Sequence, residues 1–146
     1  YAHTDDALRH ALRTLRELTR GRLLLVFGCG GSRDTGKRIK MGRVAATGAD
    51  FTLITSDNPR KESAAGIAAQ IEAGFLESNR RDYRIELDRA RAIEAALRMA
   101  AAGDTVLIAG KGHETYQEFE DTIVPFDDRV CAAEILSELM EKESAA

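Results

Sequence analysis

Five apolar residues run directly into a glycine cluster in the segment Leu23-Leu24-Leu25-Val26-Phe27-Gly28-Cys29-Gly30-Gly31. The apolar run has no polar alternation, which is typical of a strand buried on both faces of a parallel sheet. Glycines directly after such a strand permit a tight turn and a close approach of backbone to a ligand. The segment therefore predicts a central parallel strand followed by a polar loop.

The rest of the chain alternates between strand and helix patterns. Apolar runs predict strands at residues 51–55 and 105–109, and an alternating segment at 83–87 suits a sheet edge. Residues 123–126 predict a short edge strand, because Pro125 cannot donate to a ladder. Apolar periodicity and capping residues predict helices at residues 4–21, 40–49, 62–75, 89–102 and from Asp127 or Asp128 to Met140.

This alternation predicts an α/β fold that is doubly wound and Rossmann-like, with a mainly parallel sheet and helices on both faces. The length of 146 residues fits a single domain spanning 1–146. Hydrophobic residues make up 44% of the chain and charged residues 31%, so a sizeable core can form and disorder is excluded.

Composition also excludes several classes of function. With 21 Lys+Arg against 24 Asp+Glu the net charge is −3, which disfavours a general nucleic-acid binder. No apolar run reaches the ~20 residues of a membrane span, and Cys29 and Cys131 lack metal-ligand spacing. We therefore expect no nucleic acid, no membrane and a reducing, cytoplasmic setting. Because the chain starts at Tyr1 without an initiator Met, we also expect it to be a fragment of a longer protein.

Three polar loops each follow an apolar strand, at residues 29–38, 56–60 and 110–114. The carboxyl ends of parallel strands meet at one edge of a doubly wound sheet, where such folds bind ligands. We therefore expect the three loops to form one site.

The first loop comes close to two phosphate-binding patterns and satisfies neither. Arg33 replaces the third glycine of GxGxxG, and Arg38 replaces the hydroxyl residue of GxxxxGK[ST] that ligates magnesium. Three cations, Arg33, Lys37 and Arg38, indicate an anionic ligand, although a flexible glycine-rich turn or a solvated basic loop also fits.

The other two loops offer both donors and acceptors. In the second loop, Asn58 supplies an amide and Arg60 a planar fork suited to a carboxylate, although an ordinary Asx-Pro turn explains the same residues. In the third loop, Glu114 can accept hydrogen bonds from an ammonium group. His113 is expected to position other groups or to have a structural role only. The later acids are expected to form a solvated turn and a helix cap rather than a metal site: Glu118, Glu120, Asp121, Asp127 and Asp128.

Together these loops resemble the C-terminal domain of the Mur ligases, over nearly the whole chain. The resemblance rests on the start of the chain, on Gly28 to Arg38, on Asp57-Asn58-Pro59-Arg60 and on Gly110-Lys111-Gly112-His113-Glu114. The specific element is the Asp-Asn-Pro-Arg turn, which in this family recognises meso-diaminopimelate, whereas lysine-adding members differ there. The resemblance implies that the amino acid is held by Arg33, Asp57, Asn58, Pro59, Arg60, Gly110 and Glu114.

The resemblance also implies an ATP-dependent amide ligation, in which the amine attacks an acyl phosphate of UDP-N-acetylmuramoyl-L-alanyl-D-glutamate. In the family, ATP and Mg²⁺ bind mainly to a central domain and the nucleotide sugar to an N-terminal domain. Neither domain is in this chain, which is expected to be the third domain and to be inactive alone, with His3 and Asp5 touching nucleotide.

Two other functions remain open at this stage. A stand-alone α/β module for a nucleotide or an anionic metabolite would explain the glycines and cations, but not why Asn58, Arg60 and Glu114 occur together. A Rossmann oxidoreductase would use Asp57 to read a ribose, and the interrupted GxGxxG argues against it.

Overall fold

The computed structural model describes residues 3–31, 34–111 and 114–145. Helices and strands alternate along these residues, as the sequence pattern predicts. The elements are α1 (Asp5–Leu18), β1 (Leu23–Phe27), α2 (Gly36–Gly48), β2 (Phe51–Ile54), α3 (Ala64–Glu77), β3 (Tyr83–Ile85), α4 (Arg89–Met99), β4 (Thr105–Ile108), β5 (Tyr116–Phe119), β6 (Thr122–Pro125) and α5 (Asp128–Ala145).

The main sheet has four parallel strands in the order β3-β2-β1-β4. Strand β1 lies inside the sheet and is buried along its whole length, which explains its unbroken apolar run. The chain moves outward from β1 through β2 to β3 and then crosses back to place β4 on the other side of β1. The strand order therefore reverses between β1 and β4, the position at which doubly wound folds bind ligands.

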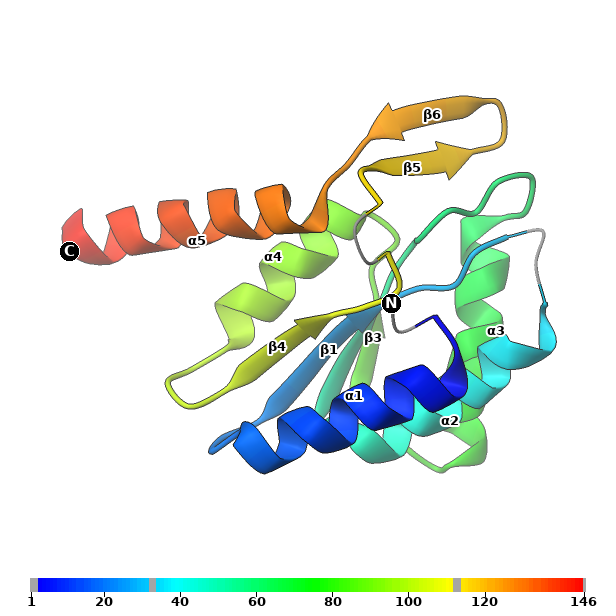
Figure 1. Ribbon diagram of the computed structural model, residues 1–146, viewed down its shortest axis with the longest axis horizontal. Helices are drawn as coiled ribbons and strands as arrows, with labels where there is room; N and C mark the ends of the chain where they lie inside the picture. Colours follow the sequence, from blue (N-terminus) through cyan, green and yellow to red (C-terminus); the bar gives the residue numbers. More distant parts are fainter. Residues whose placement is uncertain (1–2, 32–33, 112–113, 146) are drawn as a thin grey trace.

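Helices cover both faces of the sheet, so the predicted doubly wound α/β fold is confirmed (Figure 1). On one face, Leu8 and Leu12 of α1 pack with Met41 of α2 and Phe75 of α3 in one core cluster. On the other face, Ile93 and its neighbours on α4 form a second cluster against which α5 packs. The sheet thus forms a rigid base for the loops at its edge.

The ends of several elements differ from the predictions, and one strand was missed. Helix α2 begins at Gly36 rather than near residue 40, because the polar residues at its start form a full helical turn. Strand β5 was not predicted, since Tyr116–Phe119 contains two polar residues and only its antiparallel pairing with β6 makes it a strand. Among the described residues, no helix has the length and apolar character of a membrane span.

Candidate functional site

A pocket of about 210 Å³ lies at the carboxyl edge of the sheet, between the loops that follow β1, β2 and β4. The sequence predicts that these three polar loops form one site, and the pocket brings residues of all three together. The pocket is lined by glycines and Cys29 from the first loop, by the second loop, and by residues from the third loop and the start of the chain. Its predicted site residues are His3, Asp57, Asn58, Arg60, Gly110 and Glu114.

Two other predicted site residues, Asp5 and Pro59, are not among the residues that line this pocket. Asp5 lies on the wall of a separate cavity of about 730 Å³, between α1 and α2. Pro59 has a structural role in the second loop. Its carbonyl oxygen accepts a hydrogen bond from the Glu62 N–H and packs against Gly31. Arg33, like His113, lies outside the described residues.

The loops after β1 and β2 are interlocked through their backbones. The Gly31 N–H donates to the Asn58 carbonyl oxygen over 2.8 Å, and the Thr55 N–H donates to the Phe27 carbonyl oxygen over 2.9 Å. A Cβ at Gly31 would lie 1.8 Å from the Pro59 carbonyl oxygen, so only glycine fits there. The glycine cluster after β1 therefore serves first to seat the second loop.

The Asn58 side-chain oxygen is held by two donors, whereas its amide nitrogen has no hydrogen-bond partner among the described residues. Its side-chain oxygen accepts from the buried Lys111 ammonium over 3.2 Å and from the Glu118 N–H over 2.9 Å. Both partners are donors only, so the oxygen must face them and the NH₂ group must point the other way. The Asn58 NH₂ group is therefore available as a hydrogen-bond donor, and Asn58 lines the pocket.

Lys111 links the loops of the site beneath the pocket, a role that the sequence did not predict. It is fully buried, its ammonium lies 3.3 Å from Asp57 Oδ1, and it also donates to the Tyr116 carbonyl oxygen. A buried charge is stable only when it is paired, and here the pair ties the loop after β4 to the loop after β2. The one available signal was a lysine placed between two glycines directly after a buried strand.

Arg60 has an unusual backbone conformation and a side chain fixed from two sides. Its φ of 55° lies in the left-handed region, which non-glycine residues adopt mainly where function or packing requires it. The Arg60 N–H donates to the Glu118 carbonyl oxygen, and Nη1 donates to the Gly31 carbonyl oxygen over 2.8 Å. Nε lies 3.4 Å from the Glu118 carboxylate. The guanidinium is thus oriented before any ligand binds.

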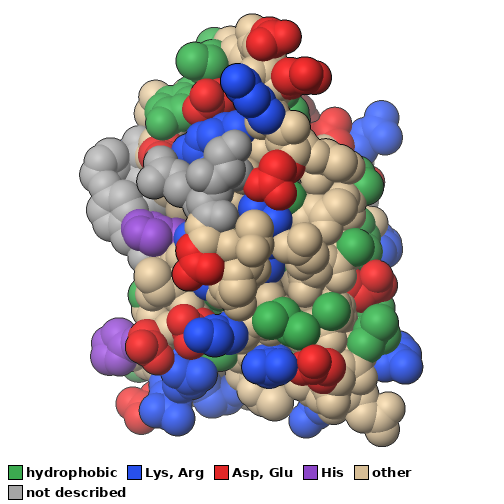
Figure 2. All heavy atoms as spheres, turned by 90° about the vertical axis from the view of Figure 1, so that its right-hand side faces the viewer, with side chains coloured by type: hydrophobic (Ala, Val, Ile, Leu, Met, Phe, Trp, Pro, Cys, Tyr) green, Lys and Arg blue, Asp and Glu red, His purple; other side chains and the backbone are tan. Residues whose placement is uncertain are grey.

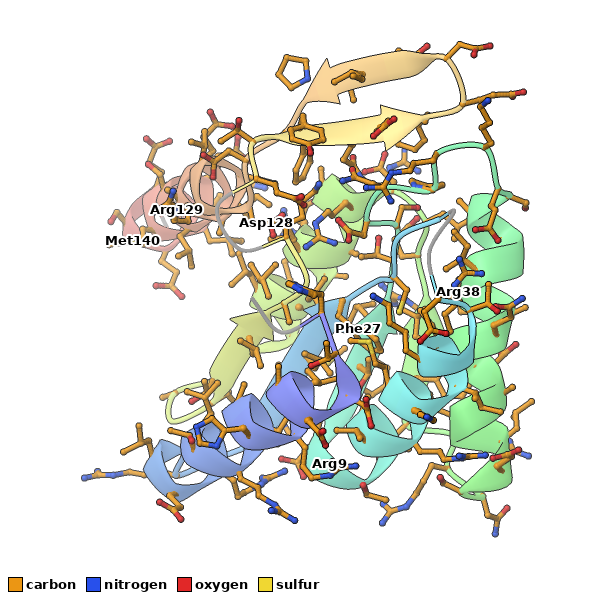
Figure 3. The ribbon with its side chains drawn as sticks, turned by 45° about the vertical axis from the view of Figure 1, so that its right-hand side comes forward. Arg9, Phe27, Arg38, Asp128, Arg129 and Met140 are labelled. Carbon is orange, nitrogen blue, oxygen red and sulfur yellow. The ribbon has the colours of Figure 1, made fainter. Side chains whose placement is uncertain are left out.

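Arg38 does not serve the pocket, contrary to the interpretation that three loop cations receive an anion. Its side chain on α2 is fully buried and pairs with Glu62 over 2.7 Å, with further bonds to Gln70 and the Gly30 carbonyl oxygen. Figure 3 shows it on α2, the helix beside α3. Lys37, one residue earlier, does line the pocket and donates to the His3 carbonyl oxygen.

The acidic residues late in the chain are more than a solvated turn. Asp127 caps α5 by accepting from the Arg129 N–H, as predicted, but Asp128 is buried and forms an ion pair of 2.7 Å with the buried Arg89. Glu118 is half-buried against Arg60. Within the described ranges no group of acids, histidines or cysteines could hold a metal ion.

Cys29 lines the pocket but is not a nucleophile. Burial raises the pKa of its thiol to about 12, and the opposing effect of Lys37 and Arg38 is smaller. Only the thiolate reacts, and at pH 8 about one thiol in 10⁴ would be ionised. A thiol reagent at pH 8 should therefore modify Cys131 first and reach Cys29 only on unfolding, as mass spectrometry of the labelled peptides can measure. Rapid labelling of Cys29 in the folded chain would contradict this assignment.

The described side chains beside the site form no continuous patch of charge of one sign. Figure 2 shows acidic and basic side chains interspersed over the face that presents α2, α3 and the tip of the β5–β6 hairpin. The net charge of −3 agrees with this mixture. The described side chains of this face therefore form no basic stripe of the kind that binds a nucleic-acid backbone.

Comparison with known proteins agrees with the fold. The family model described as "Mur ligase, glutamate ligase domain" matches residues 1–112. A curated relative from Syntrophomonas wolfei, named UDP-N-acetylmuramoyl-L-alanyl-D-glutamate–2,6-diaminopimelate ligase, is 51% identical over 136 residues, which cover 93% of this chain and 28% of the relative. A relative of the same name from Coxiella burnetii is 55% identical over 128 residues, which cover 88% of this chain and 26% of the relative.

A solved structure of a ligase with that name superposes with a TM-score of 0.89 and 44% sequence identity, and covers 96% of this chain and 28% of that one. The chain belongs to the Mur ligase family and matches its glutamate ligase domain. It spans little more than a quarter of the length of the curated relatives described here.

Proposed function

We propose that this chain is the amino-acid-binding domain of an ATP-dependent ligase that adds meso-diaminopimelate to UDP-N-acetylmuramoyl-L-alanyl-D-glutamate, in the synthesis of a peptidoglycan precursor. The observation that carries the proposal is the pocket at the carboxyl edge of the sheet, which places fixed donors and acceptors together. The names of the relatives support the same substrates.

The polarity of the pocket suits a ligand with charges of both signs. Asn58 and Arg60 present donors, while Asp57 and Glu114 present carboxylates, and Gly110 brings backbone close with its φ of 103°. Meso-diaminopimelate has two ammonium and two carboxylate groups, so it can satisfy both sets. We assign a carboxylate of the amino acid to Asn58 and Arg60 and an ammonium group to Glu114.

This arrangement would discriminate against lysine without a separate editing site. Lysine lacks the distal carboxylate, so it would leave the oriented Arg60 fork unpaired in a pocket where that side chain is only 19% exposed. A site built around a polar contact rejects an analogue lacking it by as much as ~10⁴-fold. We therefore propose Arg60 as the main discriminating group, with Arg33 as a further carboxylate ligand.

ATP, Mg²⁺ and the nucleotide sugar belong, in this proposal, mainly to parts of the full-length protein outside this chain. The described residues do not fit a magnesium site, because no suitable acid group is present and Arg38 is buried where a hydroxyl residue would be needed. The chain alone should therefore show no ATPase or ligase turnover. We keep His3 and Asp5 as nucleotide contacts, and the free cysteines agree with a cytoplasmic enzyme.

Steady-state kinetics of the full-length ligase test the proposed function. Amide formation should be measured with meso-diaminopimelate and with L-lysine as alternative amines, at saturating ATP and nucleotide-sugar dipeptide. We expect kcat/KM to favour meso-diaminopimelate by about 10³-fold or more. Equal use of the two amino acids, or no amide product with either, would overturn the proposal.

Glu114 should act in binding and not as the general base. The change Glu114→Gln keeps the shape of the side chain but removes the charge that would hold an ammonium group. In the full-length ligase we expect the KM for meso-diaminopimelate to rise by about 10- to 100-fold while the KM for ATP stays nearly unchanged.

Asp121→Asn, a change of the same kind at an exposed turn residue, is the matched control and should leave both constants unchanged. A collapse of kcat at saturating amino acid with no change in its KM would assign Glu114 a catalytic role.

A further inference from the structure

We propose that Glu118 on β5 is a positioning residue that orients Arg60 and thereby determines the preference for a diaminopimelate-type substrate. This inference rests on the proposed function, because it concerns the group that Arg60 is assigned to bind. The β5–β6 hairpin thus contributes to specificity, although none of the loops singled out in the sequence includes it.

Glu118 contacts the second loop in three ways. Its N–H donates to the side-chain oxygen of Asn58 over 2.9 Å, and its carbonyl oxygen accepts from the Arg60 N–H over 2.9 Å. Its carboxylate lies 3.4 Å from Arg60 Nε. One strand residue therefore fixes the two donor side chains of the proposed carboxylate site.

The guanidinium contacts define which edge of Arg60 remains for a ligand. Nε faces Glu118 and Nη1 donates to the Gly31 carbonyl oxygen, whereas Nη2 has no partner among the described residues. A carboxylate is bound best by a fork whose nitrogens are fixed in one plane. Without the Glu118 carboxylate, Arg60 would keep one side-chain anchor, at Gly31, and the guanidinium could rotate away from the pocket.

Glu118 acts through Arg60 and not on the ligand itself. Its side chain is 35% exposed and does not line the pocket. Its negative charge would by itself weaken the attraction of Arg60 for a substrate carboxylate. If Glu118 orients Arg60, removing its carboxylate should raise the KM for meso-diaminopimelate. If its charge only weakens the attraction for the substrate, removing it should lower that KM. The sign of the change therefore identifies the role of Glu118.

The experiment uses Glu118→Gln, Glu118→Asp and Arg60→Ala in the full-length ligase, alone and as the double variant Glu118→Gln/Arg60→Ala. For Glu118→Gln we expect the KM for meso-diaminopimelate to rise about tenfold, with kcat and the KM for ATP unchanged. Use of L-lysine should not change. Glu118→Asp should restore part of the loss, and Glu118→Gln should have no further effect in the Arg60→Ala background. Glu120→Gln, at an exposed neighbour on the same hairpin, is the control.

Each outcome decides between defined alternatives. A lower KM in Glu118→Gln would mean that the carboxylate merely competes with substrate, and equal losses in the Arg60 and Arg60→Ala backgrounds would mean that Glu118 supports the fold. Either result overturns this inference. If Arg60→Ala itself leaves the KM for meso-diaminopimelate unchanged, the proposed function of the pocket fails instead.

Discussion

Replacing Arg60 by alanine in the full-length ligase should lower kcat/KM for meso-diaminopimelate by the equivalent of about 2–5 kcal/mol. The reason is that the substrate carboxylate would lose the part-buried, pre-oriented guanidinium that is proposed to bind it. The effect on L-lysine should be far smaller, because lysine has no distal carboxylate. Competition between the two amino acids, analysed by product mass, measures both effects in one reaction.

The matched control is Arg84→Ala, because Arg84 is an exposed arginine on β3, away from the pocket lining. Arg84→Ala should change kcat/KM neither for meso-diaminopimelate nor for L-lysine. Equal losses for meso-diaminopimelate and lysine in Arg60→Ala would show that Arg60 binds a carboxylate common to both amino acids or maintains the fold.

Replacing Arg89 by methionine should lower the free energy of unfolding by about 3–5 kcal/mol, because it leaves Asp128 as an unpaired buried charge. Arg89 also donates to the Ser56 and Ala109 carbonyl oxygens, which follow β2 and β4, the strands on either side of β1. The change should therefore loosen α5 and the site together. Asp128 lies on α5 beside the site (Figure 3). Urea unfolding followed by circular dichroism measures the loss of free energy of unfolding.

Arg91→Met on the same helix is the control for this prediction. Arg91 is exposed, and its ion pair with Asp88 at 4.0 Å should contribute less than about 1 kcal/mol. Similar stability losses for both variants would show that the Arg89–Asp128 pair is not the connection that we describe.

Sequence periodicity predicted the main sheet because its strands differ sharply from their surroundings. The run from Leu23 to Phe27 is typical of a strand buried on both faces and formed one, and the alternating segment around Tyr83 did form a sheet edge. Strand β5 escaped prediction because it lies outside the main sheet. Residues 116–119 form a strand because they pair with β6. So short a segment shows no pattern of burial on one face that would have predicted it.

The members of the site were predictable, but their orientations were not. Parallel strands necessarily bring the loops after β1, β2 and β4 to one edge, so the grouping of Asn58, Arg60 and Glu114 in one pocket was expected. Which way the Asn58 amide points depends on Lys111 and Glu118, which are 53 and 60 residues away in sequence. For the same reason Arg38, a loop cation in the sequence, proved to be a buried partner of Glu62.

We propose that the pocket at the carboxyl edge binds meso-diaminopimelate through Asn58, Arg60 and Glu114. An NMR titration of the ¹⁵N-labelled chain tests it most directly, because weak binding by one domain remains measurable. We predict that meso-diaminopimelate shifts the Asn58 side-chain amide and the backbone amides of Arg60 and Gly110, and that L-lysine at the same concentration shifts them much less. Equal shifts with lysine, or shifts confined to the cavity between α1 and α2, would contradict the account.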